Sequence, residues 1–316
     1  PTWRQQLLAL MALERARLLG RLLGLDEELL NREELFEGHT AARLLAHIAA
    51  WDRIHEERLA LVLAGRTEAL VSLDLDEQNA RLLASHENWA VGQAVRTMGD
   101  AREQFLATLA EANDAQLHEP IDLPWADALP LRTWAVWRAR HDAGHRADIE
   151  RWRHTSEPAW RIGPRSLLYA ALEASHDALV ALAALVPERE REDRPLVDEW
   201  SARDILGHVA DWEQYGEACL RAGGMDEISD SDVDVWNAAH AAARRDDSYE
   251  TVVAALEQSG AGLLAALAER PSGMSLPNLW GRDMSAYAWA EGYVEHALEH
   301  VEMLQAALLA HLLRKG

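Results

Sequence analysis

Two pairs of histidines are the residues of this chain whose type and spacing are best suited to chemistry. His141 and His145 form one pair, and His296 and His300 form the other. On a helix, side chains four residues apart lie on one face with Cβ atoms about 5–6 Å apart, so two imidazoles can reach one metal ion. One such pair arises easily by accident in a chain with 14 histidines, so the prediction depends on the repetition.

A third histidine stands at a matching position earlier in each half of the chain. The segment 40–52, TAARLLAHIAAWD, aligns with the segment 201–213, SARDILGHVADWE, and this alignment pairs His47 with His208. We therefore predict one helical domain written twice, with one metal site in each copy. Triad 1 consists of His47, His141 and His145, and triad 2 consists of His208, His296 and His300.

The composition of the triads indicates the kind of metal and the kind of site. Three neutral imidazoles suit Zn²⁺, Ni²⁺, Cu²⁺ or Fe²⁺. Three protein ligands leave one position for water or substrate, as in catalytic zinc sites, and no fourth cysteine or histidine repeats with the triads. A metal held in this way lowers the pKa of a bound water or thiol and makes a nucleophile near neutral pH.

Long amphipathic helices are expected to position these histidines. Leu and Ala dominate the sequence, and the alternating Val-, Ile- and Thr-rich runs of strands are missing. Apolar periodicity predicts helices over residues 2–24, 41–64, 89–112 and 132–153 and, in the second half, over 164–185, 202–223, 248–268 and 285–313. The predicted fold class is all-α, with two tandem four-helix bundles.

Breaks in the periodic pattern indicate where the domains and connections lie. The segment 154–164 interrupts every pattern, so we predict one copy in residues 1–156 and the other in residues 157–316. The Pro-containing segments 113–130 and 270–281 are predicted to be irregular connections.

Charge and cysteine content limit the partners and the compartment. The net charge is −22 without a basic stripe, which disfavours nucleic acid. Cys219 is the single cysteine, so an internal disulfide is impossible and a reducing compartment fits. No apolar run reaches the roughly 18 residues of a membrane span, and the first residues do not resemble a signal peptide. We expect a cytoplasmic protein that binds neither membrane nor nucleic acid.

Tryptophans recur beside both triads. Trp134 and Trp289 each stand seven residues before the first histidine of a pair, and Trp51 and Trp212 each follow the earlier histidine by four. These spacings turn the indoles toward the histidines. We predict that they belong to the bundle cores, with pocket lining as the alternative. Gly144, inside the first pair, is expected to weaken its helix by about 1 kcal/mol.

Two further pairs of residues near the histidines occupy equivalent positions in the two copies: one pair could be taken for general bases, and the other indicates how the pockets differ. Asp52 and Glu213 are acidic in both copies, but five residues turn them about 140° away from the histidine, so we expect them on the solvated surface. Arg138 and Tyr293 each stand three residues before a histidine pair, so the two pockets are predicted to differ. Cys219 is expected to be a small buried residue.

The segment 199–213, EWSARDILGHVADWE, followed by His296 and His300, resembles the DinB/YfiT-like superfamily, and so does triad 1 with its surroundings. The resemblance covers nearly the whole chain as two copies. It implies a four-helix bundle in which each triad holds a divalent metal, often zinc or nickel, at one end. Similar proteins include S-transferases that use bacillithiol or mycothiol, a mycothiol-dependent isomerase and hydrolase-like protection proteins. Single-domain members often form homodimers.

Three functions are compatible with these patterns. The leading hypothesis is a detoxification or stress enzyme, S-transferase-like or hydrolase-like, in which the metal of each copy activates a low-molecular-weight thiol or water to attack a small electrophilic substrate. The alternative is a metal-stabilised binding or scaffold protein without turnover. The third is a helical interaction module with incidental histidines. The chain is expected to be a monomer that mimics the family dimer, or a homodimer.

Overall fold

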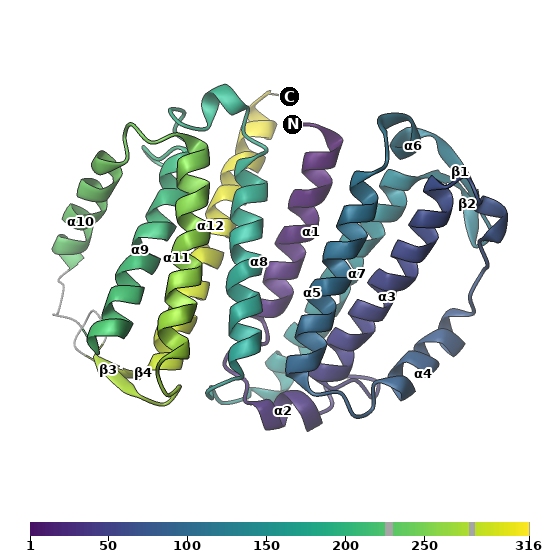
Figure 1. Ribbon diagram of the computed structural model, residues 1–316, viewed down its shortest axis with the longest axis horizontal. Coiled ribbons are helices and arrows are strands. Elements are labelled where there is room, and N and C mark those ends of the chain that lie inside the picture. The colour runs from purple at the N-terminus through teal and green to yellow at the C-terminus, as the bar shows by residue number, and fades with distance from the viewer. Residues whose placement is uncertain (225–229, 278–281, 316) are drawn as a thin grey trace. The chain divides into compact units, whose positions relative to one another are not determined.

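The chain is built almost entirely from α-helices, as predicted (Figure 1). The structure, a computed structural model, describes residues 1–224, 230–277 and 282–315. The long helices are α1 (Trp3–Gly20), α3 (Ala41–Leu63), α5 (Val91–Ala110), α7 (Leu131–Ser156), α8 (Arg165–Ala183), α9 (Ala202–Ala222), α11 (Tyr249–Ala268) and α12 (Ala286–Lys315). The shorter helices are α2 (Glu27–Arg32), α4 (Leu75–Ser85), α6 (Asp114–His118) and α10 (Asp230–Ala243), with 3-10 turns at Thr67–Ala69 and Glu188–Glu190.

The two helices that carry the earlier histidine of each triad begin at equivalent caps. The Thr40 side chain accepts a hydrogen bond from the Arg43 amide at the start of α3. The Ser201 side chain accepts one from the Asp204 amide at the start of α9, and the Asp204 carboxylate accepts one from the Ser201 amide. These caps satisfy amides that the first helical turn leaves free, and they place both histidines in the second turn.

Two pairs of short antiparallel strands lie in or directly after the segments that were expected to be irregular connections. β1 (Pro120–Leu123) pairs antiparallel with β2 (Ala126–Pro130), and Pro120 faces Pro130. β3 (Ser275–Pro277) pairs antiparallel with β4 (Asp283–Ser285) in the second half. These strands are too short to show alternation, and their prolines sit at strand ends, where a missing amide is tolerated.

Contacts divide the chain into two compact units, which are described separately here. The triad-1 unit comprises Gly24–Ala170, and the triad-2 unit comprises Pro1–Leu23 together with Ala171–Gly316. Each unit is a helical bundle that contains one complete triad. The predicted boundary between residues 156 and 157 separates the two sequence repeats, whereas these units are defined by contacts. The predicted boundary therefore stays a prediction.

Helix α1 belongs by its contacts to the triad-2 unit. Arg17 donates from Nε and Nη2 to the carboxylate of Glu302 in α12, at 2.8 and 2.6 Å. Three residues further on, Gly20 leaves room for Leu298, whose Cδ1 would lie 2.7 Å from a Cβ at this position. The first helix of the chain therefore packs on the last one.

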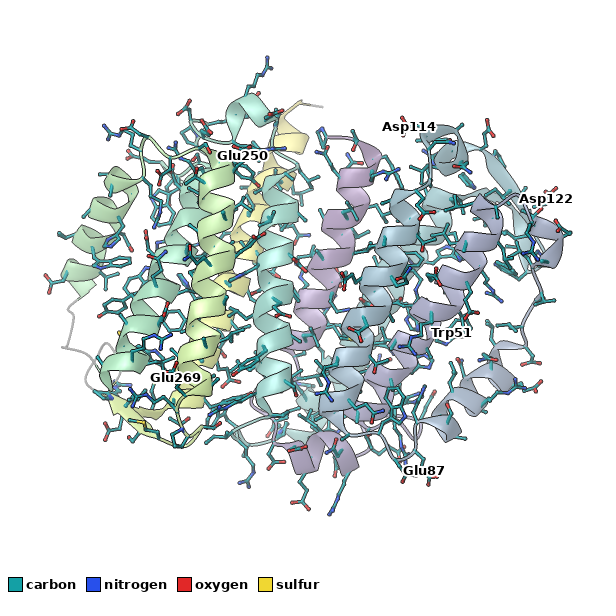
Figure 2. All side chains as sticks on the ribbon, viewed as in Figure 1. Trp51, Glu87, Asp114, Asp122, Glu250 and Glu269 are labelled. Atoms are coloured by element: carbon teal, nitrogen blue, oxygen red, sulfur yellow. The ribbon has the colours of Figure 1, made fainter. Side chains whose placement is uncertain are left out.

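Helix α11 is long and apolar enough to cross a membrane by length and composition. However, Val252, Leu256, Leu263 and Leu267 on one of its faces are fully buried, and α11 packs along α9 (Figure 1). Core packing therefore accounts for part of its hydropathy, since 39 % of this apolar window is buried. Glu250 and Glu269 lie at the two ends of this helix, and both are exposed. The other acidic residues labelled in Figure 2 are exposed as well: Glu87, Asp114 and Asp122.

Candidate metal centres

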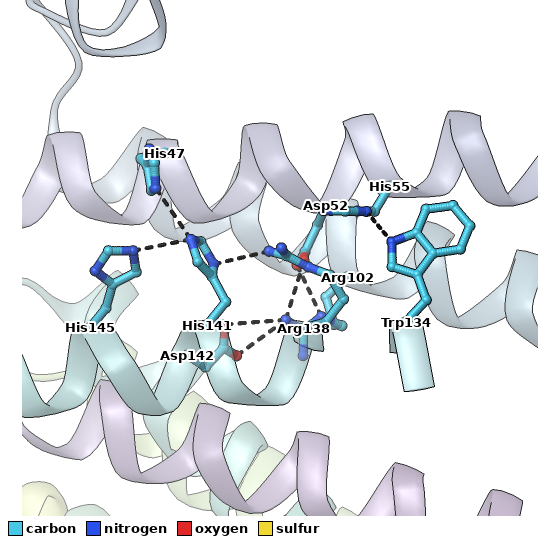
Figure 3. A network of polar contacts seen from close by, with 9 residues as sticks. All are labelled: His47, Asp52, His55, Arg102, Trp134, Arg138, His141, Asp142 and His145. Carbon is cyan, nitrogen blue, oxygen red and sulfur yellow. Dashed lines mark hydrogen bonds and ion pairs between the residues drawn. The ribbon is translucent and has the colours of Figure 1, made fainter. Parts of the chain in front are cut away.

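Triad 1 comes together between α3 and α7 of the triad-1 unit (Figure 3). Nε2 of His47 lies 3.2 Å from Nε2 of His141, which in turn lies 3.1 Å from Nε2 of His145. The three ligand atoms all lie within 4.8 Å of one another. The structure therefore brings together the three histidines that the sequence groups.

Triad 2 repeats this arrangement between α9 and α12 of the triad-2 unit. Nε2 of His208 lies 3.0 Å from Nε2 of His296, and Nε2 of His300 lies 3.1 Å from the same atom. In both triads the first histidine of the spaced pair is thus the central one. The geometry of the two copies matches to within a few tenths of an ångström.

Both the spacing and the neutral charge state of the imidazoles fit a divalent metal. Nitrogens bound tetrahedrally to Zn²⁺ at about 2.0–2.1 Å lie about 3.3 Å apart, close to the separations seen here. Burial lowers the pKa of all six: to about 3 for His47 and His296, about 2 for His208 and about 4 for His300, and below the ordinary value for His141 and His145. Metal ligation requires neutral imidazole.

The lowered pKa values predict that the metal-free protein loses stability in mild acid. Unfolded histidine has a pKa near 6.5, whereas folded His47 and His296 have values of about 3. The unfolded chain therefore binds more protons below pH 6.5, and stability is complete above this pH and falls as the pH drops toward 3. Each such histidine is expected to remove about 2 kcal/mol between pH 7.5 and 5.0.

Urea unfolding at the two pH values, with a chelator present, measures this effect. A His296→Gln variant is expected to show a smaller difference between the two pH values than the unsubstituted chain. Equal unfolding free energies at pH 7.5 and 5.0 would contradict the prediction.

A buried ion network lies behind triad 1 (Figure 3). Asp52, which was expected on the surface, has 0 % exposure. It accepts hydrogen bonds from Nε of Arg102 and from Nε of Arg138, each at 2.9 Å, and Arg102 also donates to Asp142 at 3.1 Å. The surface prediction was wrong because α3 is covered on two sides, by α5 and by α7. The rotation along the helix from His47 to Asp52 points the Asp52 side chain toward α5.

Arg138 connects this network to the central histidine of triad 1. Its Nη2 lies 3.0 Å from Nδ1 of His141. A guanidinium has only donors, so Nδ1 of His141 must accept. Neutral His141 then carries its proton on Nε2, the atom that faces the other two histidines. Arg138 has 3 % exposure and is fixed by Asp52, so the structure favours the tautomer that does not bind metal at Nε2.

Triad 2 has a different support. Tyr293 stands where triad 1 has Arg138, and the Nδ1 atoms of His296 and His300 are buried without a hydrogen-bond partner among the described residues. Glu213, also expected on the surface, has 0 % exposure. Its two oxygens bind Nε2 of His176 and the hydroxyl of Ser259, each at 2.6 Å. The correction of Asp52 thus applies to both copies.

The residue that overlies the earlier histidine also differs between the copies. His39 lies edge-on to His47, with ring centroids 5.4 Å apart, and both of its ring nitrogens lack partners in the part of the chain that the structure describes. The alignment places Trp200 at the same position, and its ring lies 4.5 Å from that of His208. In α7, the Asp148 carboxylate lies 3.3 Å from Nδ1 of His145. Such a contact orients an imidazole that binds metal through Nε2.

Each triad opens into a cavity of its own character. The cavity of triad 1 has a volume of about 430 Å³ and is lined by polar and charged residues that include Glu37, Asp76, Asp148 and Arg151. The cavity of triad 2 has a volume of about 510 Å³ and is lined mostly by apolar and aromatic residues. The predicted difference between the two pockets is therefore present.

The four repeated tryptophans are buried, as predicted, but two of them also line the cavity of triad 2. Trp51 and Trp212 each donate from Nε1 to an asparagine oxygen at 3.0 Å, those of Asn79 and Asn237. These asparagines align in the two halves of the sequence, which was a signal for the contact. Trp212 lines the triad-2 cavity together with Trp289, so for these two the alternative of pocket lining also holds.

Several polar residues around the sites were not singled out from the sequence. Arg102 interrupts the apolar stripe of α5 between Met98 and Phe105, and a charge at such a position signals a buried ion pair. His55, eight residues after His47 on the same face of α3, accepts a 2.7 Å hydrogen bond from Nε1 of Trp134. Recognising either contact requires knowing which helices are neighbours.

Two of the minor predictions can also be compared with the structure. Cys219 is buried and donates to the Tyr215 carbonyl, and burial raises the pKa of its thiol to about 12. It is therefore a poor nucleophile, as expected. Gly144 does not interrupt α7, which continues through both histidines to Ser156.

Comparison with known proteins agrees with the duplication. The family model for the DinB superfamily matches residues 10–149 and, separately, residues 171–304. Each match contains one complete triad. Neither the comparison with curated proteins nor that with solved structures finds a match. Because the two matches cover most of the sequence, the chain belongs to the DinB superfamily and carries its domain twice in tandem.

Proposed function

We propose that this protein is a metal-dependent enzyme in which each triad holds one divalent metal, zinc or nickel, and uses it to attack a small electrophilic molecule. The observation that carries the proposal is the grouping of three neutral imidazoles, one buried and two half-buried, in each copy. No fourth ligand joins either group within residues 1–224, 230–277 and 282–315. Bound there, such a metal lowers the pKa of a thiol or water at its open position and supplies the nucleophile.

The residues around triad 2 can position the reactants and receive a proton. Trp212, fixed by Asn237, and Trp289 form aromatic walls of the cavity. Glu295 lines the same cavity, and burial together with Glu299 raises the pKa of its carboxyl. A carboxylate with a raised pKa can accept the proton that a thiol or water releases. We assign this role to Glu295 in triad 2.

The scaffold function remains the alternative for triad 1. There Arg138 holds the central histidine in the tautomer with a proton on Nε2. The adjoining cavity is lined by carboxylates and by Arg151. A metal at this site would join α3 to α7 and contribute to folding.

The remaining assignments belong to the same proposal. The nucleophile is a low-molecular-weight thiol or water, and the reaction serves detoxification or stress protection in the cytoplasm. The chain acts as a monomer whose two copies replace the two subunits of a dimer, or as a homodimer. Neither nucleic acid nor membrane takes part.

Metal analysis and a thiol screen test this function. The purified chain is expected to bind two Zn²⁺ or Ni²⁺ ions, and the double variant His208→Ala/His300→Ala is expected to bind one. An exposed histidine on the same kind of helix, His154, provides the control His154→Ala. Thiol conjugation or hydrolysis of an electrophile should disappear with a chelator and should fall in the double variant, which keeps only triad 1.

The results also separate the enzyme from the scaffold. A large loss of melting temperature on chelation without turnover of any thiol and electrophile pair supports the scaffold. A chain that binds neither ion, and whose triad variants keep full stability, contradicts both functions.

A further inference from the structure

The triad-2 cavity carries an inference that depends on the proposed function but goes beyond it. His208 and His296 form one end of this cavity. The walls come from Trp212, Trp289 and Tyr293, with Met284 from β4. A volume of about 510 Å³ lies within the usual range for sites that bind small organic molecules.

One hydrogen-bond donor in these walls lacks a partner. Trp289 has 5 % exposure, and its Nε1 finds no acceptor among the residues that the structure describes. An indole N–H can only donate, and leaving it buried without an acceptor is unfavourable. In the other copy, the equivalent Trp134 donates to His55 at 2.7 Å. The unpartnered donor is therefore specific to triad 2.

Residue differences between the two copies explain why the Trp289 N–H lacks an acceptor while the Trp134 N–H has one. The alignment of α3 with α9 places Gly216 opposite His55, so the histidine acceptor is missing. A Cβ at Gly216 would lie 2.5 Å from the ring of Tyr293, so the glycine admits this ring. Tyr293 in turn replaces Arg138. The exchange removes a guanidinium and an imidazole and leaves an aromatic wall.

A second glycine keeps the cavity open beside the metal ligands. Gly292 lines the cavity four residues before His296, and no atom of the described residues lies within 4 Å of a Cβ built on it. In the other copy the equivalent residue is Trp137. A tryptophan at position 292 would therefore extend into space that is empty in triad 2.

We propose that the triad-2 cavity binds a flat, uncharged aromatic molecule with one hydrogen-bond acceptor. The ring lies against Trp212 and Trp289, the acceptor takes the Trp289 N–H, and the reactive end faces His208 and His296. In the metal-free chain, the Glu295 carboxylate in the lining disfavours anionic ligands. Aromatic surfaces favour ring contacts with a flat ligand.

Binding of the uncharged naphthalene ketone prodan tests the proposal, because this dye has a single carbonyl acceptor and fluoresces more strongly in apolar surroundings. The metal-free chain is expected to bind prodan and to bind naphthoate, an anion of similar size, at least about tenfold more weakly. Gly292→Trp is expected to weaken prodan binding at least about tenfold. The control Gly99→Trp makes the same change at an exposed position of α5 with free space around it.

A second variant protects the test against misfolding of Gly292→Trp. Trp289→Phe keeps an aromatic side chain but removes the N–H and part of the ring system, so it should weaken the binding of prodan more than that of an analogue without the carbonyl. The proposal is overturned if the unsubstituted chain does not bind prodan, or if Gly292→Trp and Trp289→Phe both bind it normally. Dye binding is measured with and without Zn²⁺, so failure of metal binding or turnover is seen separately from failure of the aromatic site.

Discussion

Replacing Asp52 with alanine is expected to lower the free energy of unfolding by about 3–5 kcal/mol, because it breaks a buried ion network on one side. Asp52 and Asp142 have 0 % exposure and together face two guanidinium groups. Without Asp52, Arg138 loses the carboxylate that it contacts at 2.9 Å, and Arg102 loses one of the two carboxylates that it contacts. Urea unfolding at pH 7.5 with a chelator present measures the loss without a contribution from metal.

Two matched substitutions show whether the burial of the charges is responsible. Glu77→Ala removes a carboxylate from an exposed pair with Arg81 and is expected to change the free energy by less than about 0.5 kcal/mol. Glu213→Ala removes the equivalent buried carboxylate of the triad-2 unit. Its partners His176 and Ser259 carry no permanent charge, so the expected loss is smaller, about 1–3 kcal/mol. A loss below about 1 kcal/mol for Asp52→Ala would contradict the network's role.

The fold and the two triads could be predicted because both depend on the spacing of residues that are close together in the sequence. Apolar residues at helical intervals define α3, α7 and their counterparts, and residues four apart on a helix are neighbours whatever the rest of the chain does. His47 and His208 were assigned by the alignment of the two halves, which substitutes for knowledge of the packing. The two strand pairs were not predicted, because strands of three to five residues leave no pattern.

The support behind the triads could not be predicted because it depends on which helices are neighbours. The spacing from His47 correctly predicted that Asp52 points away from the triad. That Arg102 lies on this side of α3 follows only from the position of α5. The same reasoning failed for Glu213, which binds His176 from α8 as well as Ser259 from α11. Gly260, which aligns with Arg102, leaves space for this histidine: a Cβ there would lie 2.5 Å from its ring. The two copies thus fill one buried position from different helices.

Weakening the contact between Arg138 and His141 is expected to raise the Zn²⁺ affinity of triad 1 about tenfold or more. A metal can bind Nε2 of His141 only if this nitrogen loses its proton and Arg138 gives up its hydrogen bond to Nδ1. A hydrogen bond to a charged group contributes about 1.5–3 kcal/mol, which corresponds to a factor of about ten to a hundred in a dissociation constant. Triad 2 has Tyr293 instead and is expected to bind Zn²⁺ more tightly.

Competition with a chromophoric chelator measures both affinities. Triad 1 is isolated in the His208→Ala/His300→Ala chain, and triad 2 in the His47→Ala/His145→Ala chain. Arg138→Met removes both the donor and the charge, whereas Arg138→Lys keeps a positive charge near Asp52 without the planar fork that reaches Nδ1. If the tautomer limits binding, both variants raise the affinity of triad 1.

An increase in Arg138→Met alone would show that the nearby positive charge repels the metal and that the hydrogen bond matters little. Equal affinities in the two triads, unchanged by either variant, would mean that Arg138 leaves His141 without cost when metal binds. Arg138 has 3 % exposure and is held at 2.9 Å by Asp52, so that movement would have to break the ion network as well. The affinity of triad 1 and the stability conferred by Asp52 are therefore two measurements of the same buried contacts.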